Sequence, residues 1–245
     1  SFKKRVDSIF ESGWLTNDGP LVKEFESEIS TLLDVRNCVS VCNGTTALDL
    51  SIRALGLSGE VIVPSFTFIS IPHTLYLYGL KPVFADIDPL TLKLDPASVE
   101  NSRTRNTSGI IAVHTWGRPC KVDDLKTIAD KHNIKLIFDA SHAFSVSANG
   151  KKIGSFGDLE TFSFHATKFI NTFEGGAITT NNDELAEKIK LMRNFGFSGM
   201  DSVVCEGKNG KMSEINAAMG LSSIENMAEF KNCNEKNFHK YKERI

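Results

Sequence analysis

The sequence has no excess of charge of either sign. Its 28 lysine and arginine residues nearly balance 30 aspartate and glutamate residues, which leaves a formal net charge of −2 at pH 7. Proteins that bind nucleic acid or anionic membranes through bulk charge carry basic patches or stripes, and this composition gives little basis for one. We therefore expect neither a nucleic-acid partner nor a membrane partner.

Motifs that bind metals or form disulfides are also missing. The five cysteines are an odd number, none belongs to a Cys-x-x-Cys pair, and no His-Glu-x-x-His motif occurs. This usage favours buried, reduced thiols and a cytoplasmic protein. Asp139, His142 and His165 are an alternative set of metal ligands, but they lack the paired spacing of known sites, so we predict no metal.

The chain opens without an apolar leader, and its longest uncharged run is interrupted. Residues 61–80 carry no formal charge over the length of a membrane span. However, Pro64, Pro72, His73 and several hydroxyl side chains break up this run. The pattern favours a buried strand followed by a buried helix over a membrane span.

Apolar runs typical of strands alternate with helical patterns along most of the chain. The predicted strands are 38–42, 60–64, 82–87, 110–114, 134–139, 159–164 and 176–180, and the helices between and around them include 20–33, 68–78, 95–101, 122–132 and 183–194. Seven strands separated by helices favour an α/β fold with a mostly parallel sheet flanked by helices. Residues 211–245 read as a long helical region.

Parallel sheets of this kind bind ligands at the carboxyl ends of their strands. Residues able to do chemistry follow four of the predicted strands: Asn43 to Thr45, His114, Asp139 and the run after Phe164. We therefore expect a ligand site at this edge of the sheet.

The turn Asn43-Gly44-Thr45-Thr46 lies between a predicted strand and a predicted helix. The free N–H groups of a helix N-terminus bind anions, and Gly44 permits a close approach, so a phosphate is the natural ligand. A plain helix cap is the alternative. The turn has neither the GxxxxGK nor the GxGxxG pattern, which argues against a Walker-type or dinucleotide site.

Asp139 and Lys168 each follow a buried strand. A carboxylate at such a position needs a partner, either the N–H groups of the next turn or a protonated pyridine nitrogen that the carboxylate keeps protonated. Lys168 is crowded by Phe162, Phe164 and Phe169. Apolar surroundings lower the pKa of an amine, and a neutral amine can form an imine and move a proton. A solvated surface lysine is the alternative.

Taken in order, the motifs resemble those of the DegT/DnrJ/EryC1/StrS sugar aminotransferases, which have the pyridoxal-phosphate (PLP) transferase fold type I. The resemblance covers nearly the whole chain. It rests on GWLTNDGPLVKEFE, NGTTALDL, VIVPSFTFIS, KPVFADIDPLTLKLDP, VHTWGRPCKVDDL, FDASHAF, GKKIGSFGDLETFSFHATK, EGGAITT and GKNGKMSEINAAMGL.

The resemblance implies pyridoxal 5′-phosphate as cofactor and a role for each matching residue. Lys168 would hold the cofactor covalently and then move a proton, and Asp139 would pair with the pyridine nitrogen. Phe68 would stack on the ring, and His142, where many members have Gln, would lie near the phenolic oxygen.

The residues implied to hold the phosphate are Gly44, Thr45 and Ser163, together with Asn209 from a neighbouring subunit. The resemblance therefore implies a homodimer with shared active sites, while Glu174 matches the family pattern without an assigned role.

The implied reaction is transfer of an amino group from L-glutamate to a keto group of a nucleotide-linked deoxysugar. The segments NTFEGGA, HTWGRPC and RNFGFSGMD look most like enzymes that make dTDP-4-amino-4,6-dideoxyglucose from the 4-keto-6-deoxy sugar for bacterial surface polysaccharide such as O-antigen. A 3-keto sugar is the nearest alternative. A pyridoxamine-dependent sugar dehydratase, which has His in place of the lysine, and a non-catalytic relative are others. Arg118 and Arg193 are candidate contacts for the diphosphate.

The resemblance also predicts the division into domains. Residues 1–225 would form the PLP-binding large domain with an N-terminal helical segment. Residues 226–245 would begin a helical connection to a small C-terminal domain, absent or truncated in this sequence, that helps to enclose the substrate.

Overall fold

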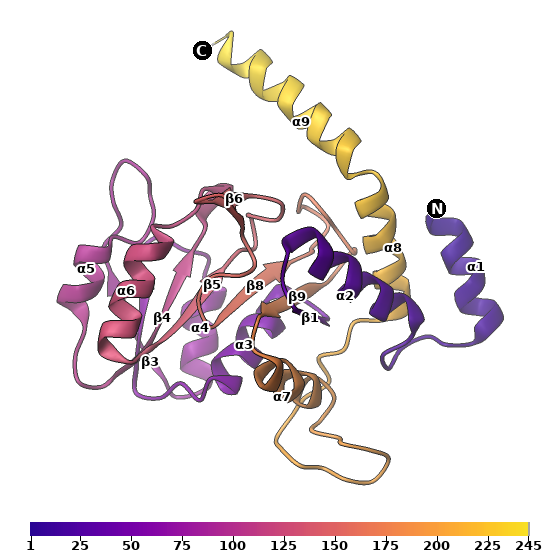
Figure 1. Ribbon diagram of the computed structural model, residues 1–245, viewed down its shortest axis with the longest axis horizontal. Coiled ribbons are helices and arrows are strands. Elements are labelled where there is room, and N and C mark those ends of the chain that lie inside the picture. Colours follow the sequence, from indigo (N-terminus) through magenta and orange to yellow (C-terminus); the bar gives the residue numbers. More distant parts are fainter. Residues whose placement is uncertain (245) are drawn as a thin grey trace.

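The computed structural model describes residues 1–244 and is built around one seven-stranded sheet (Figure 1). The strand order is β1-β9-β8-β5-β4-β2-β3. The strands are β1 (Asn37–Val41), β2 (Glu60–Pro64), β3 (Lys81–Ala85), β4 (Thr107–Val113), β5 (Lys135–Asp139), β8 (Leu159–Ser163) and β9 (Gly176–Thr180). Only β9 runs antiparallel to its neighbours in the sheet, β1 and β8. The predicted mostly parallel seven-stranded sheet is confirmed.

Helices cover both faces of this sheet. The helices α3 (Gly44–Ala54), α4 (Ser70–Leu77) and α7 (Asp183–Arg193) pack on one face, around residues such as Leu50 and Ile137. On the other face lie α2 (Pro20–Leu33), α5 (Pro96–Ser102), α6 (Val122–His132) and α8 (Glu214–Glu225), around Phe25, Phe138 and Phe162. The two faces arise because side chains alternate along each strand. Fully buried aliphatic and aromatic residues on both faces explain why the strands read as continuous apolar runs.

Several element boundaries and two local features differ from the sequence prediction. Strand β4 begins at Thr107 rather than at residue 110, and other strand and helix ends differ by one or two residues. Strand β3 ends at Ala85 rather than at residue 87. A short hairpin of β6 (Ser147–Ala148) and β7 (Lys151–Lys152) was not predicted. The helical region after residue 211 is two helices, α8 and α9 (Met227–Lys242), divided at Asn226.

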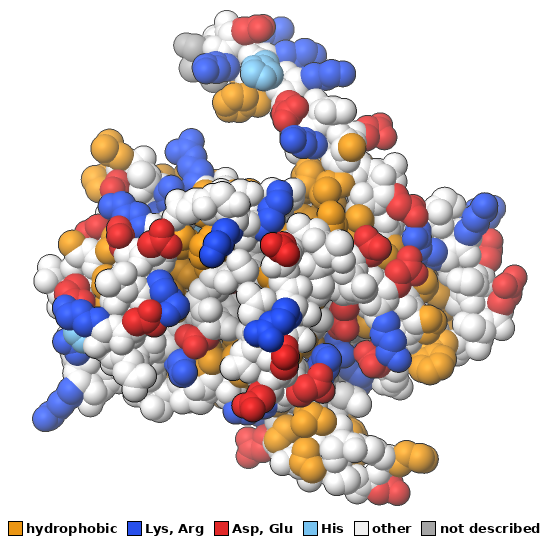
Figure 2. Space-filling model, in the orientation of Figure 1, with side chains coloured by type: hydrophobic (Ala, Val, Ile, Leu, Met, Phe, Trp, Pro, Cys, Tyr) orange, Lys and Arg blue, Asp and Glu red, His pale blue; other side chains and the backbone are white. Residues whose placement is uncertain are grey.

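Both ends of the described chain are helical. Helix α1 (Phe2–Ser12) packs beside α8, and α9 leaves the body of the protein with none of its residues buried (Figure 1). Residues 61–80 form β2, α4 and their connections. Within residues 1–244, no helix combines the length and apolar character needed to cross a membrane. Basic and acidic side chains are intermixed on the face seen in Figure 2.

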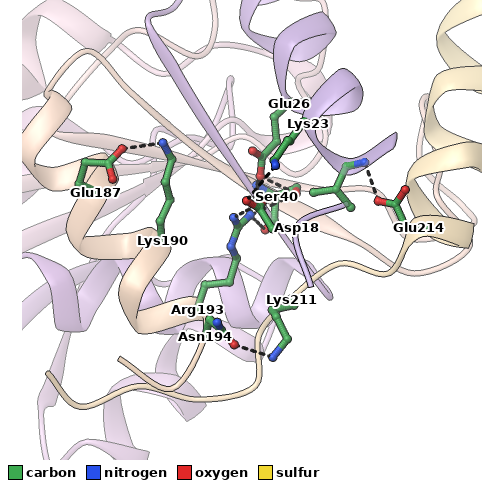
Figure 3. Close-up of polar contacts among 11 residues, drawn as sticks. Asp18, Lys23, Glu26, Ser40, Glu187, Lys190, Arg193, Asn194, Lys211 and Glu214 are labelled. Carbon is green, nitrogen blue, oxygen red and sulfur yellow. Dashed lines mark hydrogen bonds and ion pairs between the residues drawn. The ribbon is translucent and has the colours of Figure 1, made fainter. Parts of the chain in front are cut away.

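Arg193, at the end of α7, is the centre of a buried polar cluster (Figure 3). Only 5% of the residue is exposed, and its guanidinium forms ion pairs with Glu26 and with Asp18, the latter at 3.1 Å. The Nη1 atom also donates to the Ser40 carbonyl oxygen at 2.8 Å. Because these partners occupy the guanidinium, the suggestion that Arg193 contacts a diphosphate is wrong.

Candidate active site

The turn between β1 and α3 presents backbone N–H groups at the carboxyl edge of the sheet. The Asn43 side chain accepts a hydrogen bond from the Thr46 N–H at 2.7 Å, so the capping interpretation is correct for this pair. The Gly44 and Thr45 N–H groups have no acceptor within the described part of the chain. The cap uses one N–H and leaves two others without an acceptor, so the capping role is compatible with the predicted anion site.

Gly44 lies against Ser163, the last residue of β8. A Cβ atom on Gly44 would be 2.9 Å from the Ser163 Cβ and 3.3 Å from its Oγ. The glycine therefore allows the end of β8 to approach the helix N-terminus, and three of the predicted phosphate-binding residues, Gly44, Thr45 and Ser163, form one cradle.

Gly176 makes a second close approach to the same turn, which the sequence did not predict. A Cβ atom there would lie 2.6 Å from the Asn43 carbonyl carbon and 2.8 Å from the Gly44 nitrogen. A side chain at this position would collide with the backbone of the cradle. The second glycine of the Glu-Gly-Gly motif therefore lets β9 begin beside the phosphate turn.

Asp139 ends β5 with 9% of the residue exposed. Its Oδ1 accepts a hydrogen bond from the Ser141 N–H at 2.9 Å, which is the capping role weighed from the sequence. Its Oδ2 has no hydrogen-bond donor among residues 1–244. One oxygen is thus fixed by the protein, and the other can accept from a protonated ring nitrogen.

Lys168 and His142 lie close enough to Asp139 for its negative charge to affect their pKa values. Burial lowers the pKa of Lys168 from its ordinary value of 10.5, while the Asp139 carboxylate acts in the opposite direction. Burial, and then the charge of Lys168, lower the pKa of His142 from 6.5, again opposed by Asp139. The half-buried amine is therefore more readily neutral than a surface lysine, and the His142 imidazole is more readily neutral than an exposed histidine.

These effects predict how the reactivity of Lys168 depends on pH. The amine reacts only when neutral, so labelling of Lys168 by acetic anhydride should rise with pH about a midpoint below 10.5. In Asp139→Asn the midpoint should move lower still, because the charge that stabilises the ammonium is removed. Competitive labelling with a lysine model peptide in the same mixture, read by mass spectrometry, measures both. A midpoint for Asp139→Asn above that of the wild type would contradict this arrangement.

For two further predicted site residues, Phe68 and Asn209, the structure gives a position in the fold but does not test the predicted contact. Phe68 follows β2 at the same edge of the sheet and is 74% exposed; its stacking on a ring stays a prediction. Asn209 is exposed and precedes Gly210, whose carbonyl oxygen accepts the Cys42 N–H at 2.8 Å. Asn209 therefore lies near the end of its own β1, and its contact with a partner subunit stays a prediction.

His114 is not a ligand-facing residue, although the sequence places it at a strand end. It is fully buried, its ring stacks on Phe138 at 5.0 Å, and its Nδ1 accepts the Cys120 N–H at 3.0 Å. Its Nε2 lies 3.8 Å from Glu160, an equally buried acid that the sequence analysis did not single out. Among residues 1–244, no three His, Cys, Asp or Glu side chains are grouped as a metal site.

A helix N-terminus, a strand-end carboxylate and a desolvated lysine at one edge of a mostly parallel sheet define the class of PLP-dependent transferases of fold type I. The profile of the DegT/DnrJ/EryC1/StrS aminotransferase family matches residues 1–245, and the chain belongs to this family. Aminotransferases of this family depend on pyridoxal 5′-phosphate, which agrees with the cradle at Gly44 and the free oxygen of Asp139.

Two curated relatives are similar over most of the chain. The dTDP-4-amino-4,6-dideoxy-D-glucose transaminase of Shigella dysenteriae is 44% identical over 225 residues, which are 92% of this chain and 61% of the relative. The GDP-perosamine synthase of Caulobacter vibrioides is 39% identical, over 89% of this chain and 60% of the relative. The chain thus spans about three fifths of the length of these relatives.

Solved structures agree in fold. DesI, analysed in the presence of its TDP-sugar product, has a TM-score of 0.89 and 49% identity, over 93% of this chain and 58% of that one. The putative sugar aminotransferase Spr1654 from Streptococcus pneumoniae, in its PMP-form, has a TM-score of 0.87 and 27% identity, over 93% of this chain and 65% of that one.

Proposed function

We propose that this chain forms the cofactor-binding part of an aminotransferase that moves the amino group of L-glutamate to a keto group of a nucleotide-linked deoxysugar. The observation that carries the proposal is the half-buried Lys168, whose pKa is lowered by burial and is subject to the charge of Asp139, together with the approach of Ser163 to the helix N-terminus at Gly44. A plain surface lysine has neither the desolvation nor the neighbouring carboxylate.

Each residue of the site has a task that follows from its position. The cofactor, when bound, supplies a carbonyl carbon that accepts amines and a ring that withdraws electrons. Asp139 Oδ2, which the Ser141 N–H leaves free, would accept a hydrogen bond from the ring nitrogen and favour its protonated form. The N–H groups of Gly44 and Thr45 would hold the phosphate, together with the Ser163 hydroxyl.

Lys168 would act as the base that takes a proton from the substrate carbon and returns it to the carbonyl-derived carbon of the cofactor. Burial lowers the pKa of Lys168, so more of its amine is neutral than in a surface lysine, and a general base must be neutral to take a proton. His142, whose pKa is lowered by burial and by the charge of Lys168, would donate a hydrogen bond to the phenolic oxygen of the cofactor. Phe68 covers one face of the ring.

The preferred acceptor in this proposal is dTDP-4-keto-6-deoxyglucose. The 44% identical relative is a dTDP-4-amino-4,6-dideoxy-D-glucose transaminase, as is the Escherichia coli relative at 36% identity. A 3-keto acceptor is the second candidate, because a dTDP-3-amino-3,6-dideoxy-α-D-galactopyranose transaminase is 37% identical. Bacterial surface polysaccharide such as O-antigen is the proposed destination of the product.

Activity against a panel of dTDP-, UDP- and GDP-linked 3-keto and 4-keto sugars, with L-glutamate as donor, tests this choice. We expect the highest kcat/KM for dTDP-4-keto-6-deoxyglucose. A higher value for a 3-keto or GDP-linked sugar would reassign the acceptor. Loss of a sugar oxygen without amine transfer would indicate a dehydratase, and no turnover of any sugar together with no cofactor bound at Lys168 would indicate a non-catalytic relative.

The assembly and location of the protein are part of the same proposal. Residues 195–208 form a loop that projects from the body (Figure 1) and exposes Phe197, Met200, Val203 and Val204. An apolar projecting loop that ends at Asn209 supports a homodimer in which Asn209 reaches the partner's phosphate site.

The five free cysteines support a cytoplasmic enzyme. Residues 226–245 would lead to a small C-terminal domain.

A further inference from the structure

Two polar side chains near Lys168, those of His165 and Glu174, have no task in the mechanism above. His165 and Glu174 lie near the two ends of the segment that connects β8 to β9 and face each other, with 3.5 Å between the His165 Nε2 and the Glu174 Oε1. Their side chains are 46% and 61% exposed. Both residues therefore stand at the accessible rim of the catalytic edge.

The orientation of the His165 ring is fixed from its other nitrogen. The Thr167 N–H donates to the His165 Nδ1 at 3.3 Å, and the Thr167 hydroxyl lies 2.9 Å from the same atom. A backbone N–H can only donate, so Nδ1 carries the lone pair and Nε2 carries the proton. His165 therefore presents an N–H toward Glu174 and the rim of the site.

The Glu174 backbone is held in a strained turn. The preceding residue, Phe173, has a φ of 64°, a conformation that bulky side chains rarely adopt. The Asn216 side chain donates to the carbonyl oxygens on both sides of it, those of Thr172 at 2.7 Å and of Glu174 at 2.5 Å. Such strain persists only where surrounding contacts determine the conformation, and it is concentrated at functional sites.

Hydrogen bonds attach this pair to the segment that carries the catalytic lysine. The Lys168 N–H donates to the His165 carbonyl oxygen at 2.9 Å, and the Phe164 N–H donates to the Gly175 carbonyl oxygen at 2.8 Å. The position of the pair is therefore tied to that of Lys168. Exposed side-chain pairs of this kind contribute little to stability, so stability alone does not explain why a strained turn holds Glu174 beside His165.

We propose that the His165–Glu174 pair binds hydroxyl groups of the keto sugar and positions its carbonyl carbon for amine transfer. Glu174 accepts a hydrogen bond from a sugar hydroxyl, and the His165 Nε2–H donates to a sugar oxygen. The charge favours this ligand over the amino donor, because the Glu174 carboxylate repels the carboxylates of glutamate and attracts a neutral hydroxyl donor. This inference rests on the proposed function.

Measuring the two half-reactions separately distinguishes an effect on the sugar from an effect on the cofactor or the amino donor. In the first half-reaction, the enzyme loaded with pyridoxal 5′-phosphate reacts with L-glutamate alone. In the second, the enzyme loaded with pyridoxamine 5′-phosphate (PMP) reacts with dTDP-4-keto-6-deoxyglucose. Glu174→Ala should lower kcat/KM of the second about 10- to 100-fold, the loss expected for a hydrogen bond to a charged group. The first should change by less than about twofold, since that substrate does not use the pair. Glu174→Gln, which keeps an acceptor oxygen, should recover part of the loss.

A deoxy analogue of the sugar adds a readout that a purely structural role would not affect. The wild type should have a higher kcat/KM for the parent sugar than for the analogue that lacks one hydroxyl group. In Glu174→Ala this difference should disappear. Glu187→Gln is the matched control, because Glu187 forms a comparable exposed pair with Lys190 at 2.6 Å on α7; it should leave both half-reactions unchanged.

The outcomes distinguish this inference from the proposal on which it rests. Equal losses in both half-reactions, or no loss in the sugar half-reaction, would overturn the role of the pair while leaving the aminotransferase intact. A wild-type enzyme that fails in the glutamate half-reaction would overturn the proposed function and this inference with it.

Discussion

Replacing Lys168 by alanine should lower the rate of amino transfer at least about 10³-fold, because the site then has no amine to move the proton. Lys168→Arg should be as inactive. The guanidinium keeps the positive charge near Asp139, but its pKa is far above that of an amine, so it is not neutral at any working pH. Steady-state and single-turnover rates with L-glutamate and the keto sugar measure the loss.

Lys151→Ala is the control for this comparison. Lys151 is an exposed lysine on the β6–β7 hairpin, and its replacement should leave the rate within about twofold. If Lys168→Arg retained more than a tenth of the activity, the charge of residue 168 rather than its neutral amine would be what the reaction needs, and the assignment of the base would fail.

Replacing Arg193 by alanine should destabilise the fold by about 3–5 kcal/mol. The guanidinium pairs with Glu26 and Asp18 and donates to Ser40, and its removal leaves the Glu26 carboxylate, whose side chain is only 13% exposed, without its cation. Most of the destabilisation comes from this desolvated, unpaired carboxylate rather than from the hydrogen bonds that the guanidinium itself makes. Urea unfolding followed by circular dichroism measures the change in the apparent free energy of unfolding.

Two further variants test whether the burial of the ion pair causes the loss of stability in Arg193→Ala. Lys190→Ala removes an exposed cation from the same helix, whose pair with Glu187 is solvated, and should cost less than about 1 kcal/mol. The double variant Arg193→Ala/Glu26→Ala should recover part of the loss, because no carboxylate is then stranded. A cost below about 1 kcal/mol for Arg193→Ala alone would contradict the buried ion-pair account.

The sequence predicted those parts of the fold that depend on local pattern. The runs at 60–64, 122–132 and 176–180 match β2, α6 and β9 to the residue, because turn residues or a change of apolar period bound each of them. The grouping of Gly44, Ser163, Asp139 and Lys168 at one edge followed from parallel strands ending together. Their individual roles came from the resemblance to a family.

Features set by contacts between distant residues could not be predicted in the same way. The apolar pattern of β9 does not indicate whether the strand runs parallel or antiparallel to its neighbours. Its antiparallel direction depends on the connection from β8 and on the space that Gly176 leaves beside Asn43. The sequence identifies Arg193 as a cation but not Asp18 as its partner, 175 positions away. Likewise, no local signal marks the positive φ of Phe173 that orients Glu174 toward His165.

The most direct test of the central claim is the location of the cofactor on the chain. The protein is incubated with pyridoxal 5′-phosphate, treated with borohydride, digested and mapped by mass spectrometry. We predict a single stable phosphopyridoxyl group on Lys168, absent in Lys168→Ala and retained in Lys151→Ala. A group on another lysine, or one that persists in Lys168→Ala, would contradict the assignment of Lys168.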